Sequence, residues 1–202
     1  MIKVKICGIT SVRDARVAAE AGAAAIGLNF FPRSPRCVDM QTAEAIVAAL
    51  PEDVCCVGVF VDAARETVQR VASRLGLDAL QFHGEEDAAY CRGWSRTVIK
   101  AVRVRHRDAL IRAAAYPVDF ILADAYVEGL PGGTGERVPP DCLTGVARER
   151  LILAGGLTPE NVAEAIRQVR PMGVDVASGV ERAPGEKDPE RVRRFIANAQ
   201  SA

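Results

Sequence analysis

The most constraining feature of this 202-residue chain is a regular alternation of apolar, β-branched runs with segments of helical spacing. Short apolar runs are typical of buried strands, and apolar residues three or four positions apart are typical of one helix face. The strand-like runs lie at residues 2–7, 24–30, 54–61, 78–82, 97–104, 118–124, 150–156 and 173–179. Helical spacing is found between them at residues 13–22, 42–50, 64–76 and 159–170, and a short helix is expected around 138–146.

This alternation predicts right-handed βαβ units and a parallel sheet. Eight such units favour an α/β fold, a (β/α)8 TIM barrel of parallel strands, formed by residues 1–202 as a single domain. An open, doubly wound sheet is the main alternative. That fold normally carries a G-x-G-x-x-G fingerprint after its first strand, and KICGIT at residues 5–10 does not have this spacing.

Two helix starts have recognisable capping residues. Ser11 with Asp14 resembles a capping box, and Thr158 followed by Pro159 is expected to be the N-cap of the helix after the seventh strand. Gly22 and Gly76 lie where helices are expected to end.

The charge balance is neutral, because 26 Lys and Arg residues match 26 Asp and Glu residues. Such a chain has no overall field that favours nucleic acid or an acidic membrane surface. No run approaches the roughly 20 apolar residues that span a bilayer, and Lys3 and Lys5 interrupt the apolar stretch at the N-terminus. We therefore expect a cytoplasmic protein without a nucleic-acid or membrane partner.

Six cysteines are present, without a C-x-x-C pair or a Cys/His cluster at zinc spacing. They lie at Cys7, Cys37, Cys55, Cys56, Cys91 and Cys142. A disulfide framework is typical of much shorter secreted chains, so reduced thiols and no metal site are expected.

In a TIM barrel the active site lies where the strands end, at their carboxyl ends. Side-chain alternation along the first strand places Cys7 on the inner face, near the mouth. Asp124 ends the strand FILAD and precedes a Gly-rich loop. Cys7 is either a small packed hydrophobe or a base whose thiol pKa a nearby cation lowers. Asp124 either caps a turn or is a general acid.

Two glycine-containing loops indicate an anion site. Gly155 and Gly156 follow the seventh strand, and Ser178 and Gly179 follow the eighth. Loops at these positions of a barrel commonly bind phosphate, although tight turns would also require glycine. The run 132–135 (GGTG) lacks the Lys-Ser/Thr of a P-loop.

Further polar residues at strand ends are Gln81 and Asp175, both candidates for substrate binding, and Arg36 follows the second strand. Arg36 is either a solvated surface charge or a bidentate partner for a carboxylate. His83 is interpreted as the start of a helix rather than as a catalytic group. Lys5 and Lys100 are expected to point into the barrel, with Asp175 or Asp124 as their partners.

The chain resembles the phosphoribosylanthranilate isomerase family of tryptophan biosynthesis over almost its whole length. The resemblance is carried by KICGIT, GLNFFPRSPR, VGVFV, LQFHGEE, FILAD before GGTG, LAGGLTPENV, and DVASGVE with PGEKD. It departs from the usual pattern at Ala177, where a serine is common, at LQFHG in place of LQLHG, and in a longer loop after Asp124.

The resemblance implies a cofactor-independent aldose–ketose isomerase that performs an Amadori rearrangement of N-(5-phosphoribosyl)anthranilate. It further implies that Cys7 is the general base, that Asp124 is the general acid and that Arg36 anchors the anthranilate carboxylate. The loops at Gly155-Gly156 and Ser178-Gly179 would hold the phosphate.

Two alternatives are weighed against this function. A metal-dependent epimerase of phosphosugars needs several inward histidines and aspartates, and the chain has only His83 and His106. A non-catalytic phosphosugar-binding barrel would keep the glycine loops and have no use for Cys7 together with Asp124.

Overall fold

A computed structural model describes residues 2–104, 108–125 and 146–202 of the protein. The Gly-rich loop after Asp124, most of the short helix expected around 138–146, Cys142 and His106 lie outside these described residues. The other predictions can be compared with the structure directly.

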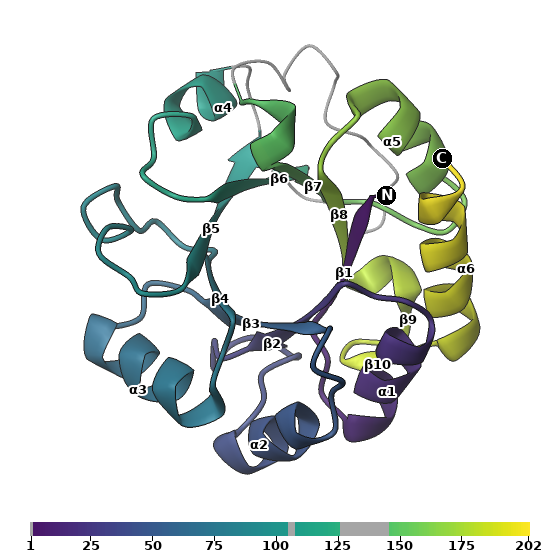
Figure 1. The fold of residues 1–202 in the computed structure, drawn as a ribbon, viewed down its shortest axis with the longest axis horizontal. Helices are drawn as coiled ribbons and strands as arrows, with labels where there is room; N and C mark the ends of the chain where they lie inside the picture. The colour runs from purple at the N-terminus through teal and green to yellow at the C-terminus, as the bar shows by residue number, and fades with distance from the viewer. Residues whose placement is uncertain (1, 105–107, 126–145) are drawn as a thin grey trace.

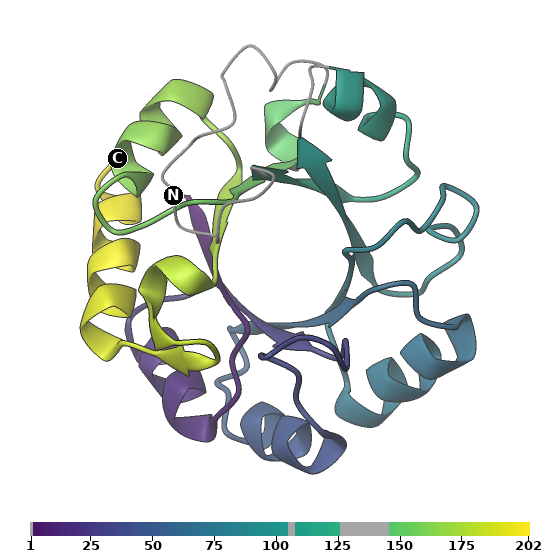
Figure 2. The same ribbon diagram turned by 180° about the vertical axis from the view of Figure 1, so that it is seen from behind.

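Eight parallel strands close into a barrel in chain order, each hydrogen-bonded to the next and β8 to β1. Figure 1 shows the ring of strands viewed from one end with the helices outside it, and Figure 2 shows the same ring from behind. The barrel strands are β1 (Lys3–Cys7), β2 (Ala25–Asn29), β3 (Cys55–Phe60), β4 (Ala79–Phe82), β5 (Thr97–Val104), β6 (Phe120–Ala125), β7 (Leu151–Ala154) and β8 (Gly173–Val176). The predicted TIM-barrel fold is confirmed.

The remaining described elements cover the outside and the rim of the barrel. The helices are α1 (Val12–Glu20), α2 (Met40–Ala48), α3 (Arg65–Leu75), α4 (Asp108–Ala113), α5 (Val162–Val169) and α6 (Pro189–Gln200), with 3-10 turns η2 (Arg148–Arg150) and η3 (Ser178–Val180). A small antiparallel pair, β9 (Glu181–Ala183) and β10 (Glu186–Lys187), follows β8 and lies beside α1 in Figure 1.

Alternate strand residues face two different apolar clusters. Val4 and Ile6 are buried in the large cluster between the strands and the helices, together with residues such as Phe195 of α6. The interior of the barrel holds a smaller cluster that includes Val57, Ile99 and Leu122. The β1 side chains with odd numbers therefore face inward, as predicted, and Lys5 lies buried in the interior.

The segment between β4 and β5 corrects the prediction of a helix after His83. Residues 83–96 form turns and contain no helix. Aromatic side chains of this segment cover the outer face of β4 in place of a helix. Tyr90 and Trp94 pack against Phe82 with ring centroids 5.1 and 5.4 Å away. The guanidinium of Arg65 lies 4.0 Å from the centroid of Trp94, which ties this segment to α3.

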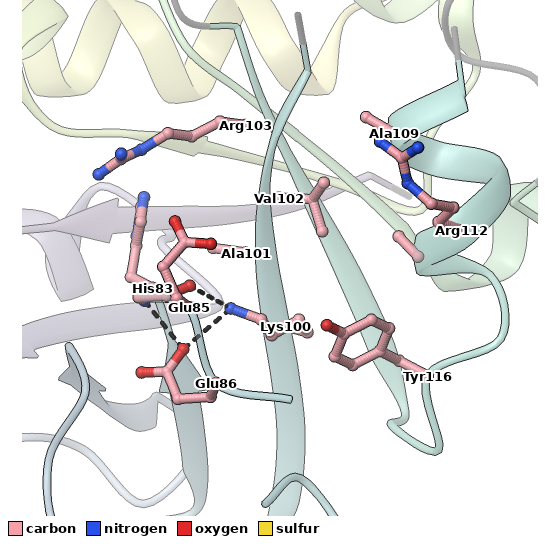
Figure 3. A pocket seen from close by; sticks show the side chains of 12 residues that line it. His83, Glu85, Glu86, Lys100, Ala101, Val102, Arg103, Ala109, Arg112 and Tyr116 are labelled. Atoms are coloured by element: carbon pink, nitrogen blue, oxygen red, sulfur yellow. Dashed lines mark hydrogen bonds and ion pairs between the residues drawn. The ribbon is translucent and has the colours of Figure 1, made fainter. Parts of the chain in front are cut away.

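The direction of Lys100 was also predicted wrongly. Lys100 is paired in register with Phe82, whose ring lies on the outer face, whereas Ile99 is paired with Gln81 on the inner face. Lys100 therefore points out of the barrel and donates to Glu86 at 2.9 Å (Figure 3). The inner lysine, Lys5, does have the predicted partner, because its Nζ donates to Asp175 Oδ1 at 2.8 Å.

Some of the predicted helix ends are confirmed, and one helix start differs. Ser11 is the N-cap of α1 and accepts from the N–H of Asp14, and Gly76 ends α3 in the left-handed conformation with φ of 63°. The start of α5 is later than predicted: Asn161 is its N-cap, and Thr158 belongs to the turn before it. None of the helices in the described residues is both long and apolar enough to cross a membrane.

Candidate active site

A cavity opens at the carboxyl ends of the strands and contains most of the predicted site residues. Its wall includes Cys7, Arg36, Asp124, Gly155, Gly156, Asp175, Ser178 and Gly179, and also Gly8, Asn29 and His83. Strands β1, β6, β7 and β8 therefore bring together residues that are far apart in the sequence. The exception is Gln81, which is fully buried and is not part of the wall.

Cys7 is the last residue of β1, where its side chain is partly exposed to the cavity. Gly27 is its neighbour on β2, and a Cβ at that position would lie 2.8 Å from the Cys7 sulfur, so glycine leaves room for the thiol. Burial raises the pKa of the Cys7 thiol, and the ammonium of Lys5 opposes this shift. Cys7 is thus a weak acid beside a cation, suited to take up a proton once it is ionised.

Lys5 keeps its charge beneath Cys7. Burial alone would lower the pKa of this ammonium, but the charges of Asp175 and Cys7 outweigh burial and raise the pKa above its usual value. Asp175 lies at the cavity wall and is only 7% exposed. Its carboxylate is engaged by Lys5 at 2.8 Å, so its evident contribution is to hold a cation next to the thiol.

Asp124 is the next-to-last residue of β6 and belongs to the inner face of that strand. Its carboxylate contacts the side chain of His83. His83 Nε2 lies 3.3 Å from Asp124 Oδ2, and His83 Nδ1 lies 3.0 Å from the amide nitrogen of Gln81. An amide N–H that donates to Nδ1 leaves the ring proton on Nε2, facing the carboxylate. Gln81 therefore fixes the orientation of His83, and His83 fixes that of Asp124.

His83 is a residue of the cavity wall that the sequence interpretation did not include in the site. It lines the cavity with Cys7 and Asp124, and it also borders a second hollow on the outer side of β5, where Figure 3 shows it near Glu85 and Arg103. The signal available in the sequence was parity: Gln81 and His83 are two residues apart, so both point to the inner side.

The loops after β7 and β8 contact each other in the wall of the cavity. Gly155 and Gly156 have φ of 86° and 61°, which side chains rarely adopt. A Cβ at Gly179 would lie 1.9 Å from the carbonyl oxygen of Leu157, so only glycine permits this approach. The absence of side chains leaves backbone groups to line this part of the cavity, as an anion site requires.

Arg36 reaches the cavity from the loop after β2 and is held from one side. Its Nε and Nη2 donate to the two carboxylate oxygens of Glu181 at 2.8 and 2.6 Å. A Cβ at Gly8 would lie 2.5 Å from Arg36 Cδ, so the glycine of KICGIT lets the arginine cross above β1. Glu181 is the last residue of the DVASGVE motif and is not among the site residues that the sequence predicts.

A family model described as N-(5'phosphoribosyl)anthranilate (PRA) isomerase matches residues 4–198 of the chain. An N-(5'-phosphoribosyl)anthranilate isomerase of Pseudomonas fluorescens (strain Pf0-1) is 51% identical over 197 residues, which cover 96% of this chain and 97% of the relative.

Solved structures agree with this match. Phosphoribosyl anthranilate isomerase from Thermotoga maritima superposes with a TM-score of 0.93 at 41% identity, with 100% of both chains covered. A structure of a phosphoribosyl anthranilate isomerase in complex with reduced 1-(o-carboxyphenylamino)-1-deoxyribulose 5-phosphate has a TM-score of 0.88 at 41% identity, and the match also covers 100% of both chains.

Proposed function

Since the chain belongs to the N-(5'-phosphoribosyl)anthranilate isomerase family, we propose that it converts N-(5'-phosphoribosyl)anthranilate into 1-(o-carboxyphenylamino)-1-deoxyribulose 5-phosphate. This is an aldose–ketose isomerisation of a biosynthetic intermediate, and the cytoplasm is the proposed place of reaction. The observation that carries the proposal is the single cavity that contains Cys7, Asp124, Arg36 and both glycine loops.

Ring opening is assigned to Asp124. Its carboxyl group would give a proton to the ribose ring oxygen while the C1–O bond breaks and the anilino nitrogen forms a C1=N⁺ iminium. The contact with His83 Nε2 at 3.3 Å supports this role, because it aims the carboxyl group and supplies a second group through which its proton can exchange.

Proton abstraction is assigned to Cys7. The thiolate would remove the proton from C2, whose C–H electrons form the C1=C2 bond as the iminium electrons return to nitrogen. The resulting enolamine then becomes the ketone by protonation at C1 and loss of the C2 hydroxyl proton. The iminium makes the C2 proton acidic, so a modest base suffices, and Lys5 stabilises the thiolate.

The two ends of the substrate carry negative charge, and the two sides of the cavity match them. The glycine loops with Gly155, Gly156 and Gly179 would bind the 5-phosphate through backbone groups, and Ser178 would add a hydroxyl. Arg36 would bind the anthranilate carboxylate through its free edge. Asp175 would act through Lys5, and Gln81 through His83, rather than by direct contact with the substrate.

The test is the loss of anthranilate-type fluorescence when the purified protein meets N-(5'-phosphoribosyl)anthranilate. We expect turnover in buffer with a chelator present, and the product identified by mass spectrometry after reduction. A protein that binds the reduced product analogue but leaves the substrate unchanged would overturn the proposed reaction and favour a binding protein.

A further inference from the structure

Arg36, Glu181 and Lys187 form a three-charge cluster at the rim of the cavity. Glu181 is the first residue of β9 and Lys187 the last of β10, so the small hairpin after β8 carries both. Lys187 Nζ donates to Glu181 Oε1 at 2.7 Å and to the carbonyl oxygen of Ala177 at 3.2 Å. The side chains of Lys187 and Glu181 are 0% and 4% exposed, whereas that of Arg36 is 23% exposed.

The hydrogen bonds leave one edge of the arginine available. A guanidinium has five N–H donors, and Glu181 takes the edge formed by Nε and Nη2. Within the described part of the chain, Nη1 has no hydrogen-bond partner, and Arg36 lines the cavity. The edge formed by Nη1 and the second Nη2 proton is therefore the one that a ligand carboxylate can occupy in a bidentate manner.

The net charge of the cluster next to that edge depends on Lys187. Arg36 and Glu181 alone sum to zero, and a second carboxylate on Arg36 would be repelled by the first. Lys187 donates to the same carboxylate oxygen, Oε1, as Arg36 Nε and restores a net charge of +1 to the cluster. The contacts lower the pKa of Glu181 despite its burial, and they raise the pKa of Arg36, so both partners stay ionised.

The hairpin is itself fixed in place. The N–H of Gly185 donates to Glu181 Oε1 at 3.3 Å, and the N–H of Lys187 donates to Asp14 of α1 at 3.1 Å. Thr10, which follows KICGI on the chain, donates its hydroxyl to the carbonyl oxygen of Gly185. The cluster is thus part of a rigid rim rather than a chance meeting of surface charges.

We propose that Glu181 and Lys187 are positioning and specificity-determining residues: Glu181 holds Arg36 with one edge facing the cavity, and Lys187 compensates Glu181 so that this edge attracts a carboxylate. This rests on the proposed function, in which that carboxylate belongs to the anthranilate ring. It gives the DVASGVE and PGEKD motifs a role at the end of the substrate opposite to the phosphate.

The experiment compares two ligands by calorimetry. One is reduced 1-(o-carboxyphenylamino)-1-deoxyribulose 5-phosphate, and the other is the same compound without the carboxyl group. The ratio of their dissociation constants reports the recognition of the carboxylate alone. We expect the protein to prefer the first ligand by about 10- to 100-fold, the usual strength of a charge-assisted contact.

Lys187→Met is expected to remove most of that preference and to leave binding of the second ligand within about twofold. In the double variant Glu181→Gln/Lys187→Met the cluster again has a net charge of +1, and the preference should return. Arg182→Met is the matched control, because it removes an exposed cation next to Glu181 and should change nothing. In turnover, Lys187→Met should raise KM while kcat stays within about threefold.

The outcomes separate this inference from the proposed function. An unchanged carboxylate preference in Lys187→Met, or a double variant with no more preference than Arg36→Met, overturns the role of the pair. If Lys187→Met does not fold, the double variant, in which the partly exposed Arg36 is the only charge left in the cluster, decides alone. A native protein without turnover of N-(5'-phosphoribosyl)anthranilate instead overturns the proposed function.

Discussion

Two buried lysine–glutamate pairs in this barrel have the same chemistry but different surroundings. On the outer face of β5, Lys100 meets Glu86 at 2.9 Å, and at the rim Lys187 meets Glu181 at 2.7 Å. Glu86 fills its remaining capacity with the backbone N–H groups of Asp62 and Gly84, both at 2.9 Å. Glu181 instead accepts two hydrogen bonds from Arg36, which reaches the cavity.

The difference shows how one interaction type can be used for two purposes. The pair Lys100–Glu86 is closed: its charges sum to zero and its contacts tie the irregular segment 83–96 to the barrel. The pair Lys187–Glu181 is open: Glu181 also binds Arg36, whose guanidinium reaches the cavity. Substitutions in the Lys100–Glu86 pair should therefore lower the free energy of unfolding, and substitutions of residues that line the cavity should lower turnover or ligand binding.

The largest effect is expected from Asp124→Asn. An amide cannot give up a proton to the ribose ring oxygen, so kcat should fall by about 10²- to 10⁴-fold while the protein unfolds at nearly the same temperature. Turnover is followed by fluorescence and unfolding by calorimetry. Full activity in this variant would remove Asp124 from the mechanism.

Lys100→Met tests the closed pair. It leaves the carboxylate of Glu86 buried without its cation, which typically costs about 3–5 kcal/mol of unfolding free energy. Urea unfolding measures the loss, and kcat and KM of the folded protein should stay the same. The double variant Glu86→Gln/Lys100→Met should recover part of the stability. A loss of kcat without a loss of stability would contradict the comparison.

Gly179→Ala tests the contact between the two phosphate-side loops. Its Cβ would meet the Leu157 carbonyl at 1.9 Å, so the loops must separate. We expect inorganic phosphate to inhibit about 10-fold less well, because its backbone donors move apart. Gly76→Ala is the control: this residue also has positive φ, 63°, but lies at the end of α3, so it should reduce stability alone.

His83→Gln tests the alignment of the acid. Loss of the ring that joins Gln81 to Asp124 should lower kcat by about 10-fold, at the low end of acid–base effects, with KM unchanged. Equal losses of affinity for substrate and for the reduced product analogue would show instead that His83 binds the ligand.

The pH profile is the smallest expected effect. Because burial raises the pKa of the Cys7 thiol, the thiolate is scarce at neutral pH and becomes more abundant as pH rises. The value of kcat/KM at subsaturating substrate should therefore keep rising on the alkaline side of pH 7. A profile that falls over this range would contradict a thiolate base.

The strands, the cavity and eight of its wall residues could be predicted from the sequence because each depends on local pattern or on position in the chain. Alternation places Cys7 at the mouth, and glycines after β7 and β8 mark the close approach there. Lys100 was misplaced because both faces of a buried parallel strand are apolar, so the pattern does not define which one is inside. The orientation follows from register with Phe82.

The contacts that complete the site come from residues far apart in sequence. Glu181 lies 145 residues from Arg36, and His83 lies 41 residues from Asp124. In place of the helix expected after His83, the chain forms turns in which Tyr90 and Trp94 pack on Phe82. This is a tertiary interaction, and the spacing of residues along the chain does not predict it. Sequence pattern thus located the reacting groups, and only the fold reveals what holds them.

The most direct test of the account is single-turnover kinetics of Cys7→Ala, with excess enzyme over N-(5'-phosphoribosyl)anthranilate. Calorimetry with the reduced product analogue first confirms that binding is intact. We predict that the fluorescence loss slows by at least about 10²-fold, the usual contribution of a general base. A rate within about threefold of that of the native protein would contradict the central claim that Cys7 is the base.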